Sequence, residues 1–116
     1  MNQQTLKDRT KFLALRVIKL VTVLPNTVAG RAIGNQLIRS GTSVGCNYRA
    51  ACRGRSRAEF ISKMGIVIEE ADETAYWLEI IIESRIMKQE LIEPLLCEAS
   101  EIIAIMAASK KTLTKK

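Results

Sequence analysis

Apolar residues recur every three or four positions through almost the whole chain, and only two prolines, Pro25 and Pro94, interrupt it. That spacing places apolar side chains on one face of an α-helix. The clearest run steps by fours and threes through Phe60, Met64, Val67, Ala71, Thr74, Leu78 and Ile81. A content of 47% apolar but only 4% aromatic residues also suits helices packed on helices better than a β-sandwich. The sequence therefore predicts an all-α fold.

Turn-forming residues divide the 116 residues into four predicted helices, at about 4–24, 27–53, 56–86 and 90–112. After Gly54, Ser56 and Glu59 have the spacing of a capping box, in which each side chain accepts a backbone N–H of the other residue. The fourth helix is expected to face the core with Leu91, Leu95, Ala99, Ile102 and Met106. Short connections force successive helices to run antiparallel, and a chain of this length buries one core. We expect a single domain over 1–116, an antiparallel up-down-up-down four-helix bundle.

The third predicted helix carries more apolar surface than one core requires. A second stripe repeats every seven residues and consists of Ile61, Ile68, Ala75 and Ile82, with Trp77 nearby. A single copy of the chain would leave part of this stripe in water, and large exposed apolar patches usually mark contacts with partners. One hypothesis is self-association through this stripe. The alternative is one unusually wide core stripe.

Glycines on the second predicted helix give another indication of close packing. Gly30, Gly34, Gly41 and Gly45 fall on one helix face. Small residues let another backbone approach closely, so Gly30 and Gly34 join the candidate subunit interface. The alternative is that Gly41 and Gly45 only permit a kink, because the run from Ser40 to Gly45 has low helix propensity.

The formal net charge of +6 conceals a strong segregation of charge. Residues 1–63 contain twelve Lys or Arg against two acids, whereas residues 64–105 contain ten acids against two bases. The basic half supplies the candidate phosphate-binding residues Arg39, Arg49, Arg53, Arg55, Arg57 and Lys63. Such a cluster can neutralise several phosphates, and the scarcity of aromatics argues against base stacking, so we expect structured RNA or DNA as the ligand. The alternative is that these arginines pair with glutamates of the third helix, within the bundle or between subunits of a protein scaffold.

Residue types that most enzymes need are missing. The chain has no histidine, which removes the commonest general base and the Glu-x-x-His ligand pairs of di-iron bundles. Cys46, Cys52 and Cys97 show no metal-ligand spacing, and three cysteines cannot all pair within one chain, so we expect small core residues with reduced thiols in the cytoplasm. No stretch approaches the ~20 apolar residues of a membrane span. We therefore expect a cytoplasmic protein with no enzymatic activity, no metal, no cofactor and no membrane association.

Two segments resemble a known family, the bacterial four-helix bundle proteins encoded within 23S ribosomal RNA intervening sequences. They are the run from Gln36 to Lys63, which contains Gly-Thr-Ser-Val-Gly-Cys-Asn-Tyr-Arg, and the run Glu-Glu-Ala-Asp-Glu-Thr-Ala-Tyr-Trp-Leu-Glu at 69–79. The resemblance implies an up-down bundle, assembly into a ring-like homopentamer and no known enzymatic activity. The family is related to the accessory variability protein of diversity-generating retroelements, which implies a basic surface that binds nucleic acid and a reverse transcriptase. A reverse transcriptase or another nucleic-acid enzyme is therefore a candidate partner.

The motif match directs attention to Arg39, Ser43, Asn47 and the arginines from Arg49 to Arg57. Asn47 has two interpretations, because its amide can bind a ligand or can bond a backbone carbonyl of its own helix beside the glycines. We group Ser43 and Asn47 with Ser56 and Glu59 as structural motif residues. The family often has an acidic residue after the first proline, whereas this chain has Asn-Thr-Val at 26–28, which leaves the subfamily and the partner open.

Overall fold

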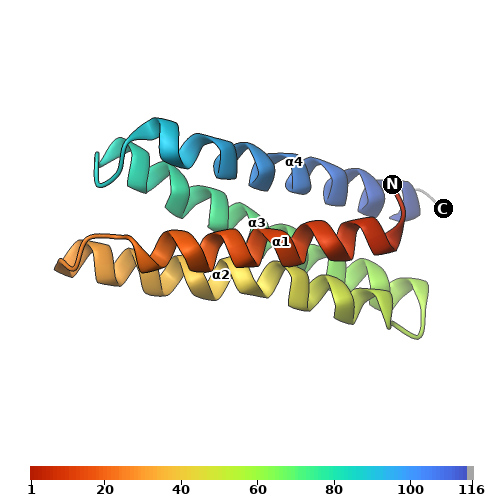
Figure 1. The fold of residues 1–116 in the computed structure, drawn as a ribbon. Coiled ribbons are helices and arrows are strands. Elements are labelled where there is room, and N and C mark those ends of the chain that lie inside the picture. Colours follow the sequence, from red (N-terminus) through yellow and green to blue (C-terminus); the bar gives the residue numbers. More distant parts are fainter. Residues whose placement is uncertain (115–116) are drawn as a thin grey trace.

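The computed structural model describes residues 1–114, and Lys115 and Lys116 of the predicted domain lie outside this range. Its four helices are α1 (Gln3–Thr22), α2 (Val28–Cys52), α3 (Arg57–Glu83) and α4 (Gln89–Thr114). They run alternately up and down, so both termini lie at the same end as the α2–α3 turn (Figure 1). The bundle measures 47 × 20 × 19 Å. The predicted all-α bundle is confirmed, and each predicted helix boundary lies within three residues of the observed one.

Polar residues fix where the first three helices begin. Asn2, Thr27 and Ser56 are the N-caps, and each side-chain oxygen accepts a hydrogen bond from a backbone N–H three residues later. The Ser56 hydroxyl oxygen accepts from the Glu59 N–H at 3.1 Å, which is the serine half of the predicted capping box. The second bond of a capping box, from the Ser56 N–H to the Glu59 carboxylate, is not formed within residues 1–114. The start of α3 is therefore set by the serine alone.

The end of α3 contains a residue with left-handed backbone geometry. Arg85 has a φ of 61°, and the N–H of Ile86 donates to the carbonyl of Ile81 at 3.2 Å. This six-to-one bond is the signature of a Schellman motif, in which glycine usually occupies the left-handed position. Ile86 packs against the core and holds the turn in place.

The core is a single apolar cluster to which all four helices contribute. The predicted stripe of α3 is confirmed, since its members from Met64 to Ile81 are buried and Phe60 is partly buried. The prediction for α4 is wrong at one position: Leu91 is 64% exposed and Ile92 is buried in its place. Starting from Ile92, the buried residues follow steps of three and four, which keeps them on the face toward the core. Within the described residues, every helix is too short or too polar to cross a membrane.

The glycine face of α2 packs against α1 of the same chain. A Cβ atom at Gly41 would lie 2.8 Å from both Cγ atoms of Val17, and Gly30 backs directly onto the carbonyl of Pro25. The close approach predicted for this face is therefore real, but the neighbour is α1. The assignment of Gly30 and Gly34 to a subunit interface is corrected, because both are buried within the chain, Gly34 against Val21 of α1 and Gly30 against Pro25 of the α1–α2 connection. α2 also continues as one unbroken helix through the glycine-rich run.

The second apolar stripe of α3 is largely covered by its own chain. Ala75 is buried, and Ile68, Trp77 and Ile82 are partly buried against the core, while Ile61 is also partly buried. One wide core stripe therefore describes these residues better than a free docking surface does.

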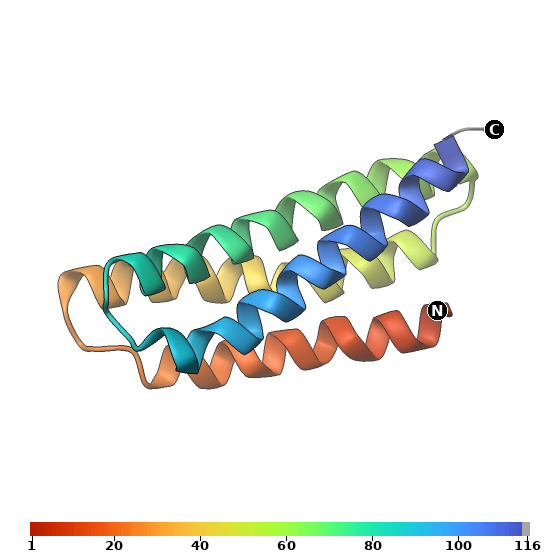
Figure 2. The same cartoon turned by 90° about the horizontal axis from the view of Figure 1, so that it is seen from above.

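The contact between α1 and α4 is small compared with the other contacts between neighbouring helices. α4 runs at an angle to α1, so that the two helices separate toward the end that holds the termini (Figure 2). An ion-pair cluster bridges them, since the Arg9 guanidinium lies 2.6 Å from a Glu98 oxygen and 3.2 Å from a Glu101 oxygen. α1 is therefore packed mainly against α2.

Candidate nucleic-acid interface

Arg39 is separated from the other predicted phosphate-binding residues by its pairing with acids of α3. Its guanidinium donates to Glu70 at 3.3 Å and to Glu73, and the Trp77 indole N–H also donates to Glu73 at 3.2 Å. The hydrogen bond with Glu73 raises the pKa of Arg39, and the bonds from Arg39 and Trp77 lower the pKa of Glu73. For Arg39, the structure shows the charge pairing within the bundle that the alternative expected, so the candidate interface is built here from the other five cations.

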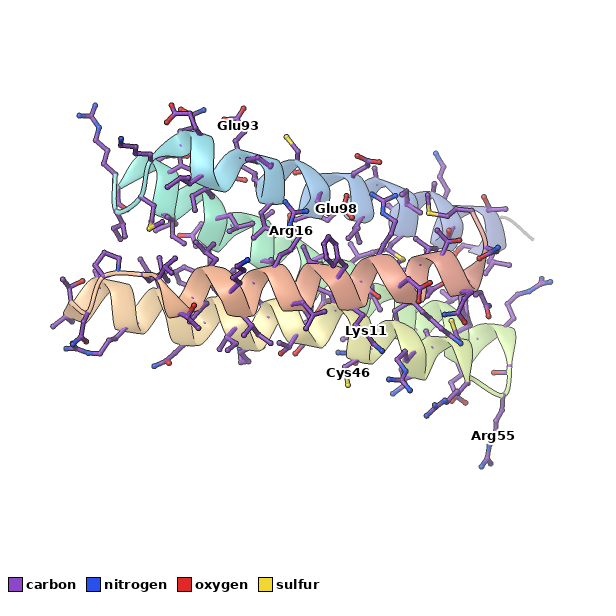
Figure 3. All side chains as sticks on the ribbon, viewed as in Figure 1. Lys11, Arg16, Cys46, Arg55, Glu93 and Glu98 are labelled. Atoms are coloured by element: carbon purple, nitrogen blue, oxygen red, sulfur yellow. The ribbon has the colours of Figure 1, made fainter. Side chains whose placement is uncertain are left out.

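The other predicted cations lie together around the α2–α3 turn. Arg49, Arg53, Arg55 and Arg57 are exposed and Lys63 is half-buried. Figure 3 shows Arg55 pointing away from the body at this turn. Within residues 1–114, none of these five cations forms an ion pair. Their charges are therefore available to a ligand.

Antiparallel packing explains why Arg39 and Arg49 differ. At the level of Arg39, α3 presents Glu70 and Glu73. Because α3 runs in the opposite direction, ten residues further along α2 correspond to about ten residues earlier on α3, near Lys63. The stretch from Phe60 to Ile68 contains no acid, so α3 offers no carboxylate at the level of Arg49, and Arg49 faces α1 instead.

A groove between α1 and α2 adds two lysines that the sequence interpretation did not single out. Lys7 and Lys11 of α1 line it together with Arg49 and Arg53 of α2. The groove has a volume of about 490 Å³, and its other lining residues are Thr10, Ala14, Thr42, Gly45, Cys46 and Ala50. Figure 3 shows Lys11 and Cys46 on the same side of the molecule. The spacing of the two lysines by four residues was the available signal, since it places both on one helix face.

Further cations reach the same end of the bundle from α4. Lys110 and Lys111 lie in its last turns, and the Lys110 ammonium nitrogen lies 3.3 Å from where a Cβ of Gly65 would be. Lysines distant in sequence thus add positive charge to the same half of the bundle as the arginines of the α2–α3 turn.

A groove between α3 and α4 has the opposite charge. Glu79, Glu83 and Glu93 line it together with Cys97. Glu93, labelled in Figure 3, lies on the first part of α4, near the end opposite Arg55. The segregation of charge along the sequence is therefore also a segregation in space.

Ser43 and Asn47 have structural roles in α2. The Ser43 hydroxyl donates to the Arg39 carbonyl at 2.7 Å, and the Asn47 amide nitrogen donates to the Ser43 carbonyl at 2.8 Å. These bonds confirm the interpretation of Asn47 as a residue that bonds the backbone of its own helix.

The chain is similar to known proteins along most of its length. A family model described as "23S rRNA-intervening sequence protein" matches residues 3–108. A crystal structure at 1.70 Å resolution shows a protein of unknown function from the S23 ribosomal protein family of Bacteroides thetaiotaomicron. It shares 35% sequence identity with this chain, the match covers 96% of this chain and 99% of that one, and the TM-score is 0.86. No curated protein matches the chain.

Proposed function

This chain belongs to the family of 23S rRNA-intervening sequence proteins, and we propose that it is a non-enzymatic, homo-oligomeric protein that binds structured RNA or DNA through its basic end. The observation that carries the proposal is the set of exposed cations around the α2–α3 turn that have no acidic partner within residues 1–114. The contrast with Arg39 supports the proposal. Arg39 is also an arginine of α2, but Glu70 and Glu73 of α3 neutralise its charge. Guanidinium groups left free in this way are suited to bidentate contacts with phosphate oxygens.

The expected mode of binding is independent of base sequence. Only five side chains in the chain are aromatic, and the cluster around Arg53 and Arg55 offers charge rather than stacking surfaces. Contacts with phosphates release counterions, so affinity should fall steeply as salt rises. The ligand is therefore recognised by its charge and shape.

The test is fluorescence anisotropy with a labelled RNA hairpin and a labelled DNA duplex at about 50 and about 200 mM salt. We expect binding that weakens strongly over this range and weakens further in the Arg49→Ala/Arg53→Ala variant. The matched control is Lys19→Ala/Arg31→Ala, which removes two exposed charges at the other end of the α1–α2 pair. Equal affinities for the two variants would contradict the proposed site.

The second candidate function is a protein scaffold that docks a nucleic-acid enzyme such as a reverse transcriptase. The pairing of Arg39 with Glu70 and Glu73 favours it, because it shows that arginines of this chain can serve protein packing. An absence of binding to RNA and DNA at low salt, with the oligomer intact, would favour the scaffold.

Self-association is proposed through α1 rather than through the α3 stripe. Phe12, Leu15 and Ile18 are 60%, 55% and 39% exposed, and they lie on neighbouring positions of the outer face of α1. We expect light scattering to give the mass of a homo-oligomer, a pentamer by the resemblance described above, and Phe12→Glu/Leu15→Glu to reduce it. A single-chain mass for the unmodified protein would rule out this part of the proposal.

A further inference from the structure

The groove between α1 and α2 has cationic side chains on both of its walls. We propose that it seats the sugar–phosphate backbone of one nucleic-acid strand, with Lys7 and Lys11 of α1 on one side of the phosphates and Arg49 and Arg53 of α2 on the other. This inference rests on the proposed function and makes Lys7 and Lys11 of α1, which the sequence interpretation did not single out, half of the binding site.

The arrangement of charge follows the length of the groove. Lys7 and Lys11 are one helical turn apart, as are Arg49 and Arg53, which corresponds to a rise of about 6 Å in each pair. That rise is comparable to the separation of successive phosphates along one strand. Among the described residues that line the groove, none is acidic. Successive phosphates of a strand lying in the groove would therefore each lie near a cationic side chain.

The bottom of the groove is made of small residues. Ala14, Gly45, Cys46 and Ala50 lie between the long cationic side chains. Thr10 is fully buried, and its hydroxyl donates to the carbonyl of Leu6 at 2.8 Å. Small side chains between long ones leave room for a backbone, while the lack of aromatic surface gives bases nothing to stack on. The groove is therefore suited to the phosphates and sugars of a strand rather than to its bases.

Arginine and lysine bind phosphates in different ways in this groove. Arginine offers a planar pair of N–H groups that can hold two oxygens of one phosphate, whereas lysine offers a mobile point charge. Removal of the lysines should therefore lower affinity without changing which nucleic acids are bound.

The prediction that the cysteines lie in the core is wrong for Cys46 and Cys97, which are exposed, and these two thiols provide a direct test of where the ligand lies. Cys46 lines the basic groove, and Cys97 lines the acidic groove between α3 and α4. The full chain is alkylated with a bulky maleimide with and without the RNA hairpin, and each cysteine is followed by peptide mass spectrometry. We expect both thiols to react in the free protein, and RNA to slow Cys46 several-fold while leaving Cys97 unchanged. Equal rates at Cys46 with and without bound RNA, or a Cys46 that is already unreactive in the free protein, would overturn the proposal.

A second experiment measures the contribution of α1. Lys7→Ala/Lys11→Ala is compared with Lys19→Ala/Arg31→Ala, after thermal melting has shown that both variants fold. Each lost phosphate contact should lower the slope of log affinity against log salt by about 0.7 to 0.9, so the groove variant should lose about 1.5 and the control close to nothing.

The outcomes separate the two proposals. If Arg49→Ala/Arg53→Ala loses binding while Lys7→Ala/Lys11→Ala matches the control, the basic end binds nucleic acid but the two-walled groove is wrong. If the unmodified protein binds neither the RNA hairpin nor the DNA duplex at low salt, both proposals are wrong.

Discussion

The hydroxyl oxygens of Ser40 on α2 and Thr74 on α3 lie 3.1 Å apart, and both side chains are fully buried. Thr74 also lies 2.8 Å from the carbonyl oxygen of Glu70, and Ser40 lies 3.3 Å from that of Leu37. This pair joins the two helices at a polar point in the buried part of their contact, inside the exposed pairing of Arg39 with Glu70 and Glu73. Buried hydroxyls are costly when they lose their partners, so the pair also fixes how α2 and α3 align.

We expect Thr74→Val, which keeps the shape of the side chain, to lower the free energy of unfolding by about 1 kcal/mol. The double variant Ser40→Ala/Thr74→Val removes both hydroxyls and should lose less than the sum of the two single changes. Urea unfolding of the four proteins measures this coupling. Strictly additive single effects would show that the two hydroxyls do not interact.

Two glycines should respond in opposite directions to alanine. Gly41→Ala places a methyl group 2.8 Å from Val17, and we expect a loss of about 1–2 kcal/mol in unfolding free energy. At Gly65 the nearest atom is the flexible end of Lys110 at 3.3 Å, so Gly65→Ala should gain up to about 1 kcal/mol from helix propensity. Thermal unfolding compares the two variants. A gain of stability in Gly41→Ala would contradict the tight α1–α2 contact.

The left-handed backbone of Arg85 predicts a stabilising substitution. Glycine adopts a φ of 61° without the steric cost that a Cβ atom imposes, so Arg85→Gly should raise the free energy of unfolding by about 0.5–1 kcal/mol. Arg85→Ala serves as the control, because it removes the charge but keeps the Cβ atom. If both variants gained equally, the charge and not the backbone would be responsible.

Acid should disrupt the Arg39–Glu73 pair in a way that tryptophan fluorescence can follow. The pKa of Glu73 lies below its ordinary value of about 4.5, so the pair stabilises the fold above that pH and its contribution is lost as pH falls through the lower, folded-state pKa. Trp77, the only tryptophan, donates to the same carboxylate and should report the change. Glu73→Gln keeps an acceptor but removes the titrating group, so the fluorescence transition should disappear. The same transition persisting in Glu73→Gln would assign it to another group.

The sequence predicts the helices well because the relevant forces are local. Repeated apolar spacing and the N-cap at Ser56 act within a few residues, so they are visible without knowledge of the fold. Leu91 and Ile92 show the limit of this argument, since both are apolar neighbours near the start of α4, yet Ile92 is buried and Leu91 is 64% exposed.

The candidate site depends on contacts between helices, which the sequence reveals less directly. The glycine spacing identified a face for close approach but not that α1 fills it. Arg39 and Arg49 are the same residue type on one helix, but Arg39 faces the glutamates of α3 whereas Arg49 lines the groove with α1. The pairing of Lys7 with Arg49 across a groove likewise follows from how α1 and α2 are aligned.

The loose attachment of α1 has a consequence for its amide hydrogens. Because α1 has an extensive contact with α2 but only a small one with α4, it should open to solvent more readily than α3, and its amides should exchange sooner. A nucleic-acid strand that bridges Lys7 on α1 and Arg49 on α2 would keep α1 packed against α2. Ligand occupancy and the transient release of α1 would then compete directly, so that deuterium uptake along residues 3–22 becomes a measure of how much of the protein is bound.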